Sequence, residues 1–212
     1  LNNDYLIIYS IIFGLWNIFL VNLINFYDGN DLNVSILIIV ILSFLFFFNN
    51  INDFINNLIF INLLLIIIFC FYNHFYPNYY FGDSGCFAFA NILNFFILVL
   101  LKDSSVNYEL FITVFYLPVI DVLCVIFYRL LLKESLYTRN YYHLYQRIAS
   151  NFTGYWYVAP TIAFPIFFSL LNYILINFYK INNLIVLIIN IPILIILYFI
   201  ILKVIISHSN VK

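Results

Sequence analysis

The chain has 212 residues, of which 66% are hydrophobic and only 8% are charged, and its formal net charge is −1. A soluble domain carries roughly a quarter charged residues because its surface faces water, so this composition excludes a soluble globular domain. The near-zero net charge gives no electrostatic basis for binding nucleic acid.

Seven apolar segments follow one another along the chain. A run of about 20 apolar residues crosses the ~30 Å hydrocarbon core as a helix, which satisfies its own backbone hydrogen bonds. The expected fold class is therefore all-α, a polytopic transmembrane helix bundle of about seven spans that forms a single integral membrane domain over residues 1–212. The expected spans are Tyr5–Phe26, Val34–Phe48, Ile55–Tyr72, Phe87–Leu101, Leu110–Leu132, Tyr155–Tyr179 and Leu184–Ile206.

The basic residues predict the orientation of these spans, because short cytoplasmic loops collect Lys and Arg. With alternating loops, one side receives only Lys102 and Lys180. The opposite side is therefore expected to be cytoplasmic, and all the unusual polar motifs fall on it. Its basic residues are Arg129, Lys133, Arg139, Arg147, Lys203 and Lys212.

The first polar motif, residues 22–31, lies at the cytoplasmic end of the first expected span. Asn22 and Asn25 are three residues apart and so share a helix face that can hold an amide-rich ligand edge. Asp28 and Asp31 flank a turn that Gly29 permits. The alternative interpretation is a polar helix end followed by an ordinary Asp-Gly turn.

The second motif, Phe-Gly-Asp-Ser-Gly at residues 81–85, comes just before the fourth expected span. The two glycines beside Asp83 leave the backbone free to approach a phosphate or a metal ion. Mg²⁺ suits this pattern, since it usually takes one or two carboxylates and fills its other positions with phosphate and water. The alternative is a turn in which Asp83 or Ser84 caps the next helix, a role that can coexist with metal binding.

The third motif lies within the fifth expected span, where Pro118 bends the helix near Asp121. An ionisable residue at membrane depth usually faces a partner or a water-filled cavity. Arg129 follows eight residues later on nearly the same helix face. A structural ion pair inside the bundle is the alternative to a functional role.

The fourth motif is a cytoplasmic loop, residues 139–147, in which basic, aromatic and amide groups are concentrated around His143. Arg139 and Arg147 suit a phosphorylated ligand, because Arg donates to phosphate in a bidentate manner. The alternative is that the preference for basic residues on the cytoplasmic side explains both arginines.

In order and spacing, the four motifs resemble those of the polyprenyl-phosphate N-acetylhexosamine-1-phosphate transferases (MraY/WecA-type, glycosyltransferase family 4). The resemblance covers about residues 22–147. The Asn-x-x-Asn-x-x-Asp-Gly-x-Asp pattern is matched at residues 22–31, and the Phe-Gly-Asp-x-Gly pattern at residues 81–85. A Pro-x-x-Asp within a span, matched at residues 118–121, precedes the His-containing loop.

The resemblance implies an enzyme of the plasma membrane with its active face in the cytoplasm. It would transfer a sugar-1-phosphate from a UDP-sugar to polyprenyl (undecaprenyl) phosphate and release UMP, with Mg²⁺ as cofactor, in cell wall or lipopolysaccharide biosynthesis. Besides the two substrates and the lipid bilayer, a homodimer partner is left open. The implied catalytic residues are Asp28, Asp83 and His143, with Asp83 as the metal ligand, and the implied substrate-binding residues are Asn22, Asn25, Asp31, Asp121, Arg139 and Arg147.

Two features depart from the family pattern. No two acidic residues adjoin in this chain, so the family's Asp-Asp pair on an earlier cytoplasmic loop has no counterpart. The chain also has seven expected spans where the family has ten or eleven, and it contains no methionine. Together these features predict an N-terminally incomplete chain, the C-terminal portion of a larger transferase bundle.

Two other functions compete with the transferase. The first is an ion-coupled transporter that uses Asp121 as an intramembrane carboxylate. It predicts polar residues on several helices and access from both sides, whereas the polar motifs gather on one face. The second is an inactive membrane remnant of a transferase, which the missing Asp-Asp pair favours.

Overall fold

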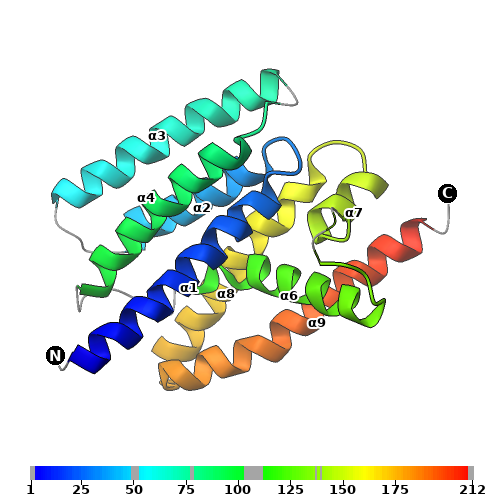
Figure 1. The fold of residues 1–212 in the computed structure, drawn as a ribbon. Helices are drawn as coiled ribbons and strands as arrows, with labels where there is room; N and C mark the ends of the chain where they lie inside the picture. The colour runs from blue at the N-terminus through cyan, green and yellow to red at the C-terminus, as the bar shows by residue number, and fades with distance from the viewer. Residues whose placement is uncertain are drawn as a thin grey trace. The chain divides into compact units, whose positions relative to one another are not determined.

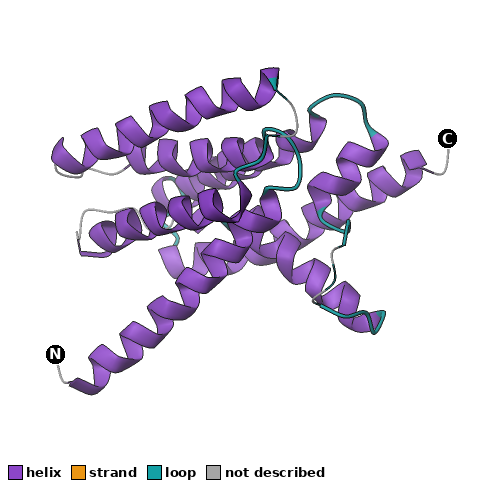
Figure 2. Ribbon diagram, turned by 45° about the horizontal axis from the view of Figure 1, so that its top comes forward, coloured by secondary structure: helices purple, strands orange, loops and turns teal. Residues whose placement is uncertain are grey.

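The computed structural model describes residues 3–48, 53–76, 79–102, 112–136, 138 and 140–209. Within these ranges all regular structure is helical, with 8 α-helices and no strands (Figure 2). The prediction of an all-α protein is confirmed for this part of the chain. The helices, shown in Figure 1, are α1 (Asn3–Tyr27), α2 (Asn33–Phe48), α3 (Asp53–Phe75), α4 (Gly82–Lys102), α6 (Tyr116–Leu131), α7 (Leu144–Asn151), the 3₁₀ turn η1 (Trp156–Val158), α8 (Ala159–Asn177) and α9 (Asn183–Ser209).

Five of these helices are long and apolar enough to cross a membrane: α1, α3, α4, α8 with η1, and α9. The chain is therefore a multi-pass membrane protein. The helices α2 and α6 are shorter, with 16 residues each. At a rise of about 1.5 Å per residue, such a helix is roughly 24 Å long.

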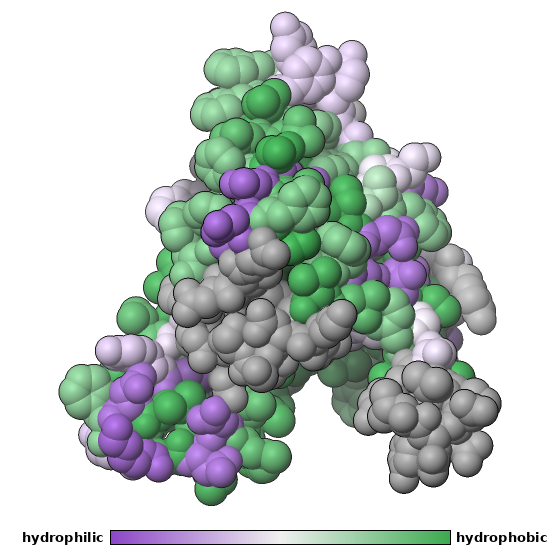
Figure 3. All heavy atoms as spheres, turned by 90° about the vertical axis from the view of Figure 1, so that its left-hand side faces the viewer, coloured by the Kyte–Doolittle hydropathy of each residue, from purple (hydrophilic) through white to green (hydrophobic). Residues whose placement is uncertain are grey.

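The outer surfaces of the long helices are apolar, as a lipid environment requires. Large hydrophobic side chains such as Ile68, Phe71 and Phe199 are more than half exposed. Much of the face drawn in Figure 3 is accordingly hydrophobic. In water this surface would be unfavourable, whereas among lipid tails it costs little.

The chain divides into two compact units. The first comprises Leu1–Ser35 and Asn50–Val106, and the second comprises Ile36–Asn49 and Asn107–Lys212. In the first unit α1 packs along α4. In the second, α6, α7, α8 and α9 surround a core that includes the buried rings of Phe168 and Tyr198. The prediction of one integral membrane domain stays a prediction.

Amide side chains link helices inside each unit. In the first unit Asn17 of α1 exchanges hydrogen bonds with Asn91 and Asn94 of α4. In the second, the Nδ2 group of Asn190 on α9 donates to Oδ1 of Asn172 on α8 at 2.6 Å and to the Tyr116 hydroxyl at 3.2 Å. Hydrogen bonds of this kind hold membrane helices together, because lipid offers an amide no other partner.

Three differences from the expected elements bear on the site. α4 begins at Gly82 rather than Phe87, so residues 82–85 form its first turn. α6 begins at Tyr116, and the expected start of that span, Leu110, lies outside the described residues. The expected loop 133–154 contains the short helix α7, whose buried residues Leu144, Tyr145 and Ile148 lie on one face.

Candidate functional site

The first unit brings the first and second sequence motifs together around Asp28. Its Oδ1 atom accepts a hydrogen bond from the backbone N–H of Phe81 at 3.1 Å, and its Oδ2 atom accepts one from Gly82 at 2.8 Å. The Cys86 thiol lies 3.8 Å from the same Oδ2 atom. Asp28 therefore caps the N-terminus of α4, a role usually filled by the residue that precedes a helix.

The carboxylate of Asp83 lies next to this cap. The Nδ2 group of Asn25 donates to its Oδ1 atom at 3.2 Å, across 58 residues of sequence. Asp83 is exposed, and no described residue donates a hydrogen bond to its Oδ2 atom. One oxygen of this carboxylate is thus positioned by the protein while the other is open to a ligand. We call Asn25, Asp28 and Asp83 the Asp28 cluster.

The environment of Asp28 favours its neutral form. Burial raises the pKa of this carboxyl above its usual 3.8, and the nearby Asp83 carboxylate acts in the same direction. The hydrogen bonds from Gly82, Phe81 and Cys86 oppose the shift but do not outweigh burial. Asp28 therefore titrates at a higher pH than an exposed aspartate.

A residue that the sequence analysis did not single out also supports this cluster. Asn73 of α3 is buried, and its Oδ1 atom accepts the backbone N–H of Leu32. Its Nδ2 group donates to the carbonyl of Tyr79 at 2.8 Å. Asn73 thus ties the turn after α1 to the segment that leads into α4. Only its polar character directly after an apolar run could have indicated this role.

The contacts just described do not include the other two residues of the first motif. The side chain of Asn22 donates to the Ile18 carbonyl of its own helix at 2.7 Å. Asp31 lies in the turn between α1 and α2. Of the four predicted residues in this motif, the structure places Asn25 and Asp28 beside the second motif.

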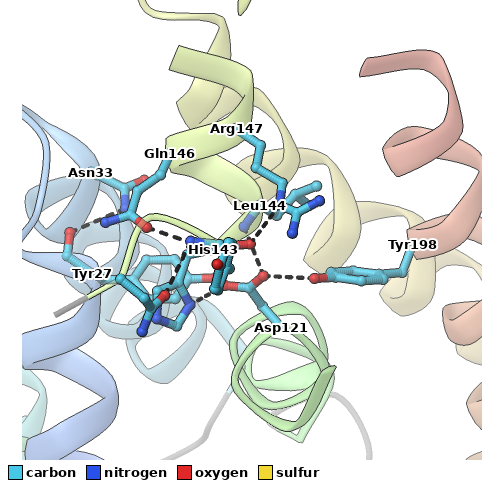
Figure 4. A network of polar contacts seen from close by, with 10 residues as sticks. Tyr27, Asn33, Asp121, His143, Leu144, Gln146, Arg147 and Tyr198 are labelled. Carbon is cyan, nitrogen blue, oxygen red and sulfur yellow. Dashed lines mark hydrogen bonds and ion pairs between the residues drawn. The ribbon is translucent and has the colours of Figure 1, made fainter. Parts of the chain in front are cut away.

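The second unit brings the third and fourth motifs together around Asp121, which is fully buried. Its Oδ2 atom lies 2.9 Å from Nδ1 of His143, and its Oδ1 atom accepts the backbone N–H of Leu144 at 2.8 Å and the Tyr198 hydroxyl at 2.9 Å (Figure 4). We call Asp121, His143 and Tyr198 the Asp121 cluster. It joins the start of α7 to both α6 and α9. No pattern in the sequence indicated Tyr198 as a member.

Arg129 makes contacts different from those that its spacing suggested. Arg129 does not pair with Asp121, the alternative considered above. It contacts the segment that follows α6 instead. The guanidinium donates to the carbonyls of Ser135 and Leu136 and to the Thr138 hydroxyl, and its Nε atom lies 3.8 Å from Glu134. Arg129 is buried, so these contacts fix the chain where it leaves α6.

Arg147 is held by aromatic residues. Its Nε–H donates to the Tyr142 carbonyl at 2.9 Å, and its Cζ atom lies 5.5 Å from the ring centroids of both Tyr128 and Tyr142. A hydrogen bond to Glu134 raises the pKa of Tyr142, so this phenol stays a donor. Arg139, the other predicted phosphate contact, lies outside the described residues.

The carboxylates of the Asp28 cluster could serve as ligands in only one kind of metal site. Among the residues that the structure describes, no three His, Cys, Asp or Glu side chains gather to hold a metal ion. Both oxygens of Asp28 are occupied by donors, whereas one oxygen of Asp83 is open. Asp83 therefore fits a Mg²⁺ ion that takes most of its ligands from substrate phosphate and water, rather than from the protein.

Comparison of the chain with family models, curated proteins and solved structures gives no match.

Proposed function

We propose that this chain carries the activity of the family that it resembles, the transfer of an N-acetylhexosamine-1-phosphate from a UDP-sugar to polyprenyl phosphate. The observation that carries the proposal is the contact between Asn25 and Asp83. Two motifs that the sequence separates by more than fifty residues meet there around an exposed carboxylate with one open oxygen. A site that would bind a diphosphate together with Mg²⁺ needs such a carboxylate.

The reaction is a phosphoryl transfer, in which positioning and charge neutralisation matter more than covalent chemistry by the protein. An oxygen of the lipid phosphate attacks the β-phosphorus of the UDP-sugar, the bond from that phosphorus to the bridging oxygen breaks, and UMP leaves with the electron pair. Asp83 would hold Mg²⁺, and the bound ion would neutralise the charge of the diphosphate. Asn25 orients Asp83, and Asp28 keeps the start of α4 in place for it.

The Asp121 cluster has a positioning role in this proposal. Asp121 holds His143 and the first backbone N–H of α7, so the loop that carries the fourth motif is fixed at that point. His143 is buried, and its Nδ1 atom is committed to Asp121. Its contact with substrate phosphate or sugar stays a prediction.

The proposal includes a finer membrane topology than the five long helices give. We infer that α2 and α6 also cross, which makes seven spans in all, and that the turn after α1, the start of α4 and the loop before α7 belong to the cytoplasmic side. The basic residues Arg129, Lys133 and Arg147 support this orientation. The enzyme would then meet its soluble substrate at the cytoplasmic face of the plasma membrane.

An exchange assay tests the activity. The gene product containing this chain is expressed in membranes, and the incorporation of labelled UMP into UDP-N-acetylhexosamine is measured with and without polyprenyl phosphate and Mg²⁺. We expect exchange only when both are present. Asp83→Asn should lower it by about a hundredfold, the usual cost of losing one group that stabilises charge at the reacting atoms.

Asp53 provides the matched control, because it too is an acidic residue in the first turn of an apolar helix. Asp53→Asn should leave the exchange rate unchanged. Exchange that persists in Asp83→Asn would contradict the metal role. Exchange absent under every condition would favour the inactive remnant.

A transporter is less well supported. An intramembrane carboxylate that carries ions has to gain and lose a partner during transport, whereas Asp121 accepts three hydrogen bonds within its own unit. Asp121 therefore has the environment of a structural residue.

A further inference from the structure

A groove of about 720 Å³ lies within the second unit. One face of α6 forms one wall, with Leu123, Phe127 and Leu131, and one face of α9 forms the other, with Ile195, Phe199 and Leu202. In both helices the lining residues recur every three or four positions, so each wall is a continuous stripe. We call this feature the α6–α9 groove.

The α6–α9 groove is open to the outside of the unit. Leu123, Phe127 and Phe199 are 53%, 64% and 55% exposed, so their side chains line the groove without filling it. In a membrane such an apolar groove takes up hydrocarbon, because water would find no hydrogen-bond partners along these walls. Its shape and chemistry suit a lipid chain.

Two cations, Arg147 and Lys203, also line the groove. The guanidinium of Arg147 is fixed in two ways. Its Nε–H donates to the Tyr142 carbonyl, and its plane packs near the rings of Tyr128 and Tyr142. No other residue in the described part of the chain accepts a hydrogen bond from Arg147, and none pairs with the exposed Lys203. A held guanidinium with open terminal N–H groups is a bidentate donor for phosphate.

We infer that the α6–α9 groove binds an anionic phospholipid of the bilayer, with its headgroup phosphate on Arg147 and Lys203 and an acyl chain along the apolar walls. Basic pockets between membrane helices on the cytoplasmic side bind anionic headgroups in this way. The apolar walls favour this ligand over a soluble phosphate, because a soluble phosphate has no hydrocarbon to pack against them. The inference depends on the membrane location and not on the transferase activity.

A photocrosslinking experiment tests the site. The full chain is reconstituted in phosphatidylcholine bilayers that contain a trace of phosphatidylglycerol with a diazirine in one acyl chain, and the labelled peptides are mapped by mass spectrometry. We expect labels on the groove faces of α6 and α9. A diazirine phosphatidylcholine carries the same headgroup phosphate and also a choline cation, which Arg147 and Lys203 repel, so it should label the same peptides at least about tenfold less.

The double substitution Arg147→Gln and Lys203→Gln removes both cations and should reduce phosphatidylglycerol labelling of the groove to the phosphatidylcholine level. The control is Lys180→Gln, which, like Lys203→Gln, removes one lysine charge but from the loop between α8 and α9, and which should leave labelling unchanged. Circular dichroism of each variant checks folding. The single substitution Lys203→Gln, at an exposed side chain, should show a partial loss even where Arg147→Gln unfolds the chain.

Three outcomes would overturn the inference. Equal labelling by the two phospholipids would remove the role of the headgroup charge. Unchanged labelling in Lys203→Gln and in the double variant would remove the role of the cations. Loss of the label when polyprenyl phosphate, UMP or inorganic phosphate is added would assign the groove to a substrate or a free anion instead.

Discussion

The Nδ1 atom of His143 lies 2.9 Å from the Oδ2 atom of Asp121, and both side chains are buried, one on the loop before α7 and the other in α6. The contact spans 22 residues of sequence. The Asp121 carboxylate also accepts hydrogen bonds from the first backbone N–H of α7 and from the Tyr198 hydroxyl of α9. One buried side chain thus satisfies donors from three elements.

Asp121→Ala should therefore be strongly destabilising, because three donors lose their acceptor inside the unit. The expected loss is about 3 kcal/mol, since each buried donor left without its hydrogen bond costs about 1 kcal/mol or more. Thermal unfolding in detergent measures it. Asp53→Ala, at an exposed position, should cost less than about 1 kcal/mol, the usual contribution of an acidic residue in a first helical turn. Equal effects of the two substitutions would contradict the contacts described for Asp121.

Asp28 and Asp83 should respond differently to substitution, although both belong to the Asp28 cluster. Asp28→Ala releases the N–H groups of Phe81 and Gly82 and should cost about 1 kcal/mol or more, as loss of a helix cap does. Asp83→Ala should change the free energy of unfolding by less than about 0.5 kcal/mol, because its carboxylate is exposed. Thermal unfolding of both variants checks this. A larger loss of unfolding free energy in Asp83→Ala would show that the main role of Asp83 is structural.

The raised pKa of Asp28 predicts a pH dependence of stability. The folded state holds the Asp28 proton more tightly than the unfolded state does, because burial disfavours the carboxylate. This contribution is fully present below the ordinary pKa of 3.8 and is lost as the pH rises through the higher pKa of the folded state. The Tm of the wild type relative to Asp28→Asn should therefore fall as the pH rises above about 4. A rising difference would contradict the sign.

Gly82 has a backbone φ of +65° at the start of α4, a conformation that L side chains rarely adopt. Gly82→Ala should thus be destabilising by about 1 kcal/mol although space for the methyl group exists. Gly14 lies inside α1, and its added Cβ would also meet nothing within 4 Å. Gly14→Ala should be neutral or stabilising, because alanine favours helix. A destabilising Gly14→Ala with a neutral Gly82→Ala would contradict both assignments.

The apolar segments could be predicted from the sequence because each carries its own signal. Each of the seven overlaps one of the long helices or α2 or α6 over most of its length. The start of α4 could not be predicted in this way. Gly82 and Asp83 favour a turn locally, and the helix begins there because Asp28, from another part of the chain, accepts its first N–H groups. A cap supplied from so far away leaves no local pattern.

The candidate site was predictable to a similar degree. The motifs identified Asp28, Asp83, Asp121 and His143, whereas their partners Asn73 and Tyr198 are an ordinary amide and a tyrosine among many. The eight-residue spacing placed Arg129 on the same helix face as Asp121, but spacing does not choose between partners. The carbonyls of Ser135 and Leu136 take the guanidinium instead.

The amide pair between Asn172 and Asn190 bears on how the protein is made. α8 ends at Asn177 and α9 begins at Asn183, so the two helices emerge from the ribosome in quick succession. Either asparagine alone would enter the bilayer with its amide unsatisfied, at a free-energy cost that pairing lowers. The helices α8 and α9 are therefore expected to leave the translocon together, as one preassembled hairpin.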